Sequence, residues 1–587
     1  MSSDLPTVAG NIVQAFSTDL QCLVLFHPEE GVPQAILQPF TEDDNLLLVS
    51  LDHTAITSKN PDNPQSNTCT IEFEQQIDED NNPVRDDLIN NSCLVWSDSQ
   101  GKNAIHSRQV LLHILHSMQQ HGKVLIASGD LYSSQRTAAT LFFQSKPPCI
   151  EPYSSSSSSD DDNEEDGKAD DENIAEDANV MTEICCIGFH NTDKIRLYQF
   201  SSEEANGLSN DVISKNWKFG IIKDNVQKFI GIPEFKLAES PWWTFETSNE
   251  HHLEARRLVL GIFNYMWHRG YHTVVPVDCY VKGYLGVQGD MDNLIFYRNI
   301  RFDEQSQTRH VINKNEPTEF ICLCLERTHK LRIVGTSADG TTHQAVRQAV
   351  AESWSQGVKE SSIYEDSYQI KVNGTPWGHR TTPEAVAAAQ LVCTIIEALF
   401  EHGWIWHCAI DMTRSLVDKS TFFFRRVARP LTNIRIGCIQ PKGLSKINLV
   451  RFPPSFLITI MEELQTNKNS GESGVDNTDD GWFGAGISEI TIHENGMSGT
   501  IEFDTNIHTT TEDNIKNQVV RNSKIYRKLI TRLLEYQYPH TKLLGFGDIW
   551  TCETKDDELY IRDTDACFFS FPYKEHDWNM TSTHSLV

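Results

Sequence analysis

The sequence predicts an α+β protein built from about four diverged tandem copies of one module, each a small, mainly antiparallel sheet with two helices. Three observations support this prediction. A tryptophan motif occurs twice, an amphipathic helix that stops at glycine occurs three times, and a short strand ending in aspartate follows each such helix. Consecutive strands joined by short turns favour antiparallel pairing, with the helices on one face.

The tryptophan motif begins with Trp-x-x-Gly, at Trp217 and Trp354, and ends in a Pro-Trp pair, at Trp242 and Trp377. The tryptophans of each motif are 25 and 23 residues apart. Matched spacings of matched residue types indicate duplication of one folded unit. Two roles are open to Trp242 and Trp377: an anchor in the core, or an exposed aromatic platform for a ligand or partner.

The recurring helix ends at Gly122, Gly270 and Gly403. The positions 12, 11, 8 and 4 residues before each glycine are apolar in all three copies, which is the spacing of one helical face. Glycine stops the helix because it adopts the left-handed conformation without a Cβ penalty. The apolar residues are Val110, Leu111, Ile114 and Met118; Leu258, Val259, Ile262 and Met266; and Leu391, Val392, Ile395 and Leu399.

An apolar strand follows each helix and ends in aspartate, at Asp130, Asp278 and Asp411. An aromatic strand comes next, with the sequences TLFFQ, NLIFYR and TFFFRR. A weaker fourth copy closes the chain with Asp548 and DACFFSF, although His540 replaces the glycine. The fourth copy is therefore predicted to share the back half of the module.

These motifs and the polar stretches between them divide the chain. We expect module one at 1–150 with a polar insert at 52–91, an acidic linker at 151–180, module two at 181–300, module three at 319–428 and module four at 432–575. The linker is predicted to be disordered, because low hydrophobicity and like charges cannot offset the entropy of ordering. Modules one and four are the diverged copies.

Composition predicts the setting and excludes two classes of partner. The net charge of −31 disfavours nucleic acid and anionic membranes, because such binding depends on lysine and arginine. The first residues lack the features of a signal peptide, and no apolar run is long enough to cross a membrane. We therefore expect an intracellular, cytoplasmic protein whose cysteines are mostly buried thiols.

Four recurring residues are candidates for a ligand or partner surface: Trp242, Trp377, Asp278 and Asp411. A carboxylate at a strand end often faces substrate in α/β enzymes. An aspartate needed in every copy is more typical of a turn that fixes the following loop. The candidate surface would lie between modules two and three, whose motifs match best.

The sequence contains no motif for a serine nucleophile, a phosphate-binding loop or a zinc site. His113 and His116 share a helical face and are interpreted as solvated residues. We therefore expect no metal, no cofactor and no catalytic residue. A catalytic cysteine and its histidine can lie far apart in a sequence, so the motifs alone do not decide whether the chain is an enzyme.

The serine run within the acidic linker, which precedes Asp160–Asp162, contains candidate phosphorylation sites. Ser157, Ser158 and Ser159 each have an aspartate three residues later, a pattern that acidophilic kinases favour. A solvated spacer is the alternative interpretation.

The leading hypothesis for function is a tandem-repeat interaction or scaffold protein without catalytic activity, which binds other proteins. The alternative is an enzyme or small-ligand-binding protein with a site between modules two and three. Specific function is expected where the copies differ, at 281–292 and 52–91.

Overall fold

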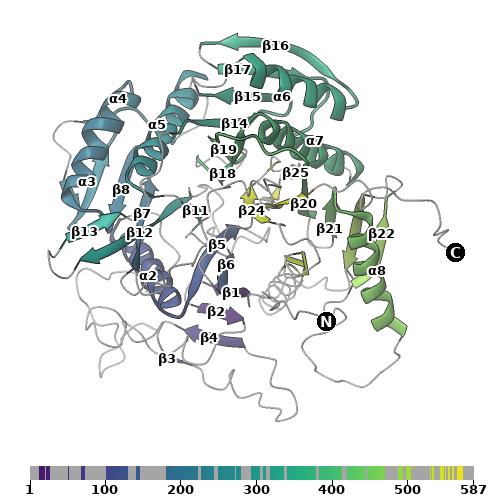
Figure 1. Ribbon diagram of the computed structural model, residues 1–587, viewed down its shortest axis with the longest axis horizontal. Coiled ribbons are helices and arrows are strands. Elements are labelled where there is room, and N and C mark those ends of the chain that lie inside the picture. The colour runs from purple at the N-terminus through teal and green to yellow at the C-terminus, as the bar shows by residue number, and fades with distance from the viewer. Residues whose placement is uncertain are drawn as a thin grey trace, which may run out of the picture.

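Four antiparallel sheets with one shared strand order make up the computed structural model of this chain (Figure 1). The structure describes the strands within residues 12–26 and 50–72, most of residues 101–145 and 180–469, and parts of residues 487–572. If the strands of each module are numbered along the chain, leaving out one extra strand at the end of module two and a small separate hairpin in module four, every sheet has the order 3-4-2-1-6-5. The predicted tandem α+β modules are confirmed, and the fourth copy has the same topology as the others.

Modules one and two lie at the bottom and left of Figure 1. Module one contains β1 (Ile12–Asp19), β2 (Cys22–Phe26), β3 (Ser50–Leu51), β4 (Thr68–Glu72), α2 (Gly101–Gln120), β5 (Lys123–Gly129) and β6 (Thr140–Ser145). Module two contains β7 (Val180–His190), β8 (Lys194–Tyr198), α3 (Ser202–Gly207), η3 (Leu208–Ile213), α4 (Ser214–Asn216), β9 (Gln227–Phe229), β10 (Ile232–Lys236), α5 (Asn249–His268), β11 (Thr273–Val277), β12 (Asn293–Asp303) and β13 (Thr308–Val311). The polar stretch 52–91 thus supplies β4, an inner strand of the first sheet.

Modules three and four complete the molecule. Module three contains β14 (Phe320–Glu326), β15 (Lys330–Val334), α6 (Gly340–Ser353), β16 (Val358–Tyr364), β17 (Ser367–Val372), α7 (Thr382–Glu401), β18 (Trp404–Ile410) and β19 (Thr421–Arg426). Module four contains β20 (Ile434–Lys442), β21 (Lys446–Val450), α8 (Pro454–Asn469), β22 (Ile487–Ile492), β23 (Ser498–Phe503), β24 (Lys542–Gly547), the small hairpin of β25 (Glu553–Lys555) and β26 (Glu558–Tyr560), and β27 (Ala566–Pro572).

The recurring helices α2, α5 and α7 end where the sequence predicts. Gly122, Gly270 and Gly403 follow them with φ angles of 69°, 84° and 80°. These values lie in the left-handed region, which only glycine enters without strain. The glycine stop thus turns the chain from each helix directly into the following strand.

Each helix packs between two sheets, its own and that of the next module. The helix α2 contacts β7, α5 contacts β14 and β15, and α7 contacts β20 and β21. In β14, Ile321, Leu323 and Leu325 face the module's own helices, and Phe320, Cys322 and Cys324 face α5. Burial on both faces explains why this strand is apolar along its length. The eight cysteines whose side chains the structure describes are free and buried.

The helix α7 also contains a segment that resembles a membrane span. Among the residues that the structure describes, only Pro383–Glu401 has the necessary length and hydropathy, and 67% of it is buried inside the molecule. Its position between the sheets of modules three and four accounts for this apolar composition.

The modules close into a ring around their fifth strands (Figure 1). β5 contacts β11, β11 contacts β18, β18 contacts β24, and β24 contacts β5. These strands are the inner edges of their sheets, so each sheet extends outward from the centre. At the closure between the last and first modules, Phe546 stacks on Phe142 with ring centroids 5.3 Å apart. Packing protects these edges from pairing with other chains.

Candidate functional site

The structure places the motif tryptophans inside their own modules. Trp242 and Trp377 are fully buried. Their indole N–H groups donate to the backbone carbonyls of Lys194 and Lys330, at 3.3 and 2.9 Å. These carbonyls occupy the same place in β8 and β15, at the first residue of each strand. The two tryptophans therefore fix equivalent Pro-Trp turns, and they do not form a surface shared by modules two and three.

The aspartates Asp278 and Asp411 follow the neighbouring inner strands β11 and β18. Asp411 joins the two modules through its backbone. Its N–H donates to Oδ2 of Asp292 at 2.6 Å, and its carbonyl accepts from the N–H of Asp292 at 3.2 Å. The carboxylate of this bridge belongs to Asp292, at the end of the 281–292 segment that is special to module two. Asp130 and Asp548 lie outside the described residues.

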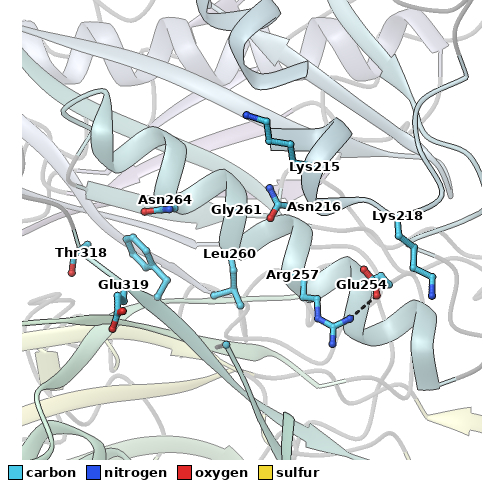
Figure 2. A pocket seen from close by; sticks show the side chains of 12 residues that line it. Lys215, Asn216, Lys218, Glu254, Arg257, Leu260, Gly261, Asn264, Thr318 and Glu319 are labelled. Carbon is cyan, nitrogen blue, oxygen red and sulfur yellow. Dashed lines mark hydrogen bonds and ion pairs between the residues drawn. The ribbon is translucent and has the colours of Figure 1, made fainter. Parts of the chain in front are cut away.

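A groove does lie between modules two and three, away from those four candidates (Figure 2). It has a cavity volume of about 360 Å³ and runs between α4 and α5 on one side and the beginning of β14 on the other. Asn264 and Thr318 line it with polar groups, and Leu260 and Phe320 provide apolar surface. The residues come from four separate segments, and none is one of the recurring tryptophans, glycines or aspartates.

The cationic side chains that line this groove are each paired with a carboxylate. Lys215 pairs with Asp211 at 3.1 Å, and Lys218 pairs with Glu250. Arg257 lies 2.5 Å from Glu254 on its own helix and 3.0 Å from Glu365 of module three. Because each cation has a carboxylate beside it, the groove favours a polar ligand over a strongly anionic one.

A close approach of two helices forms one wall of the groove. A Cβ atom at Gly261 of α5 would lie 2.7 Å from the side chain of Asn216 in α4. Figure 2 shows these two residues side by side. Glycine at this position therefore allows α4 to pack against α5, which sets the width of the groove.

An aromatic cluster beside the groove surrounds His407. The imidazole centroid lies 5.0 Å from the ring of Phe263, 5.1 Å from Phe320 and 6.4 Å from Trp267. Burial, and secondarily the charge of Arg425, lower the pKa of His407 to about 3. The ring is therefore neutral near pH 7. Phe320 belongs to both the cluster and the groove, so the two features adjoin at the boundary of modules two and three.

His407 occupies a β-bulge that recurs around the ring. The pairing of β18 with β19 skips His407, and the corresponding pairings in modules one and four skip Ile126 and Leu544. A bulge re-aims a side chain, and Ile126 and Leu544 pack against the core of the neighbouring module. Sequence reasoning missed His407. The signal was available, because this position is apolar in the other copies, with Val274 in module two.

The remaining candidates from the sequence are the histidines of α2 and the serines of the linker. Nδ1 of His116 lies 2.7 Å from the carbonyl oxygen of Leu112, one turn earlier in α2. Among the described residues, no group of three or more His, Cys, Asp or Glu side chains could hold a metal ion. Ser157, Ser158 and Ser159 lie outside the described residues, as does the acidic linker up to residue 179.

Comparison with known proteins identifies the repeat independently. One domain-family model matches the chain three times, at residues 40–144, 183–297 and 319–425. The three matches together cover more than half of the chain and fall on modules one, two and three. Module four is related to them by its strand order. No curated protein and no solved structure matches the chain.

Proposed function

The chain belongs to the domain family that matches it three times, and from this premise we propose that it is an interaction scaffold: a ring of four modules that binds other proteins on its outer surface. The observation that carries the proposal is the continuity of apolar cores across module boundaries. Cys408, Ile410 and Phe423 of module three belong to one core with Phe263 of module two. Apolar interfaces of this kind oppose motion between domains, so the outer strands stay in fixed relative positions.

The proposed partners are proteins, and the proposed setting is the cytoplasm. The net charge of −31 supports this choice, because it disfavours nucleic acid and anionic lipid. The eight described free cysteines also support it, because thiols persist in a reducing compartment. The proposal includes no catalytic step.

Crosslinking mass spectrometry on the full-length chain, purified from its own cells, tests the proposal. We expect reproducible crosslinks from lysines of the outer surface to one or a few proteins. The same purification with a chain that lacks residues 151–180 separates the contribution of the acidic linker from that of the ring. A chain that purifies alone and shows only internal crosslinks, in both forms, would overturn the scaffold proposal.

The groove supports a second candidate, the binding of a small polar ligand between modules two and three. Its cavity of about 360 Å³ is of the size that small-molecule sites have. Native mass spectrometry should then detect a bound molecule that is lost in an Asn264→Trp variant, in which the indole fills the groove. Equal masses bound to both chains, or none to either, would count against this candidate.

A further inference from the structure

The outer edge strands of the ring differ in length, and β16 is the longest of them. β16 has seven residues, β22 has six, β9 has three and β3 has two. Each lies at the end of its sheet farthest from the centre, and β16 follows the upper rim in Figure 1. Short edge strands protect a sheet from pairing with other chains. β16 is less protected than its counterparts in modules one and two.

Exposed apolar side chains lie on this same strand. Ile363 is 73% exposed and Tyr364 is 41% exposed. Single exposed apolar residues are ordinary on protein surfaces. Two of them beside an edge that offers backbone N–H and C=O groups are the elements of recognition by strand addition, in which an extended peptide joins a sheet.

The strand register places the two side chains on opposite faces of the sheet. Ile363 is in line with Tyr368 and Ile333, and Ile333 faces the helices of module three. Tyr364 is in line with Val334, which faces module two. The guanidinium of Arg332 lies 5.3 Å from the centroid of the Tyr364 ring. Arg332 itself is buried and pairs with Glu326 at 3.0 Å. An added strand would therefore meet the side chain of Ile363 on one face and the ring of Tyr364 on the other.

A basic cluster lies at the other end of β16. Lys371 is the cross-strand neighbour of both Lys330 and Glu360. Burial, and the charges of the cluster, lower the pKa of the adjacent His329. Glu326 and Glu360 neutralise part of this charge, which leaves a local positive excess on a chain of net charge −31. The cluster consists of Arg327, Lys330, Lys359 and Lys371.

We propose that β16 binds an extended segment of a partner protein as an additional strand, and that this segment alternates acidic and apolar residues. The acidic side chains would lie on the side of Tyr364, toward the exposed Lys359 and Arg327 of the basic cluster, and the apolar ones would lie on the side of Ile363. Alternation follows from the pleat, which sends successive side chains to opposite faces. This inference rests on the proposed scaffold function and specifies its partner.

A second copy of this chain is a poorer occupant. Antiparallel pairing of two β16 strands about Ser361 would place Lys359 opposite Ile363, a charged side chain against an apolar one. Two chains of net charge −31 also repel each other. A partner segment rich in acidic residues has neither disadvantage at this strand.

Fluorescence anisotropy with the full-length chain and labelled synthetic peptides tests the inference. The first probe alternates Asp or Glu with Val or Ile, the second replaces its acids by lysine, and the third carries N-methyl groups on alternate backbone nitrogens. We expect the first to bind in a salt-sensitive manner, and the other two to bind at least about tenfold more weakly. Equal binding of the N-methylated probe would overturn strand addition, because that probe cannot complete the ladder of backbone hydrogen bonds.

Matched variants locate the site on the chain. Ile363→Lys places a charge on the edge strand, and Lys359→Glu reverses part of the basic cluster; each should weaken binding of the first probe about tenfold or more. The controls make the same changes elsewhere, with Met181→Lys at another exposed apolar residue and Arg429→Glu at an exposed arginine. All four positions are exposed or partly exposed, so thermal unfolding should be unchanged. Binding that the two β16 variants retain in full would overturn the proposal.

The outcomes separate this inference from the scaffold function. Failure of the wild-type chain to bind the first probe, with protein crosslinks that persist in the Ile363→Lys chain, would overturn the β16 site and leave the scaffold standing. A concentration-dependent dimer that Ile363→Lys abolishes would instead assign the strand to a second copy. Binding of the first probe by the wild-type chain, with weaker binding by the two β16 variants, supports the site whatever the crosslinking of the whole protein shows.

Discussion

His407 is half-buried as a neutral imidazole at a position where the other modules have Ile126, Val274 and Leu544. Three aromatic rings surround it, and Arg425 lies nearby. Protonation would place an unpaired positive charge in this environment, which costs free energy. The stability of the packing between modules two and three therefore depends on pH through this residue.

We predict that His407 makes the chain less stable in acid. Its pKa in the folded chain, about 3, lies below the unfolded value of roughly 6.5. The unfolded chain therefore takes up the proton first. The contribution of neutral His407 to the stability of the folded chain is complete above that unfolded pKa and falls as pH decreases toward 3. From pH 8 to pH 5, His407→Leu should gain about 1 to 2 kcal/mol relative to wild type. Urea unfolding at both pH values measures this change, and a constant difference between the two chains would contradict it.

The tryptophans show how far residue-scale prediction reaches. The matched spacings predict equivalent roles, and the structure gives equivalent bonds: the indole N–H of Trp217 donates to Ala238 O and that of Trp354 to Asn373 O. The spacings could not distinguish a core anchor from a surface platform for Trp242 and Trp377. Burial decides between them, and burial depends on helices that lie elsewhere in the chain.

Among the elements, the helix, its glycine stop and the strand after it were predictable, because their signals are local. The outer strand was not. β16 has the sequence VKESSIY, which lacks a clear alternation of apolar and polar residues, and it is a strand because it pairs with β17. Strand formation that depends on a partner leaves little trace in local sequence. The groove likewise leaves little trace in local sequence, because its lining comes from two modules.

Glu397 gives a test of how α7 joins module four. Its carboxylate accepts two hydrogen bonds from Arg451, at 2.7 and 2.8 Å, and one from the backbone N–H of Ile436 at 2.7 Å. Glu397→Gln should destabilise the chain by about 2 to 4 kcal/mol, because the largely buried Arg451 loses its charge partner. Arg435 pairs with the same carboxylate but is 36% exposed, so Arg435→Gln should cost less than about 1 kcal/mol. Urea denaturation checks both, and equal losses would contradict this assignment.

For the whole molecule, ring closure follows from how each helix is covered. Each helix packs between its own sheet and the sheet of the next module. In a linear array the helix of the last module would have no next sheet, and such open arrays need capping repeats. Here the helical residues Tyr526, Leu529, Ile530 and Leu533 of module four belong to a core that also contains Ala127 and Phe142 of module one. Closure thus removes both ends. No motif in the sequence predicts it, because the contact joins the first and last modules.

Hydrogen exchange in a Phe546→Ala chain tests ring closure most directly. Phe546 lies in β24 and stacks on Phe142 of β6, so truncation should cost roughly 3 to 5 kcal/mol at a contact between distant modules. We predict faster exchange across residues 123–145 of module one, as well as in β24 and β27. Phe452→Ala, which removes a ring packed against Phe569 and Phe571 within module four, should affect residues 123–145 much less. Unchanged exchange across 123–145 in the Phe546→Ala chain, with loosening confined to module four, would contradict the closed ring.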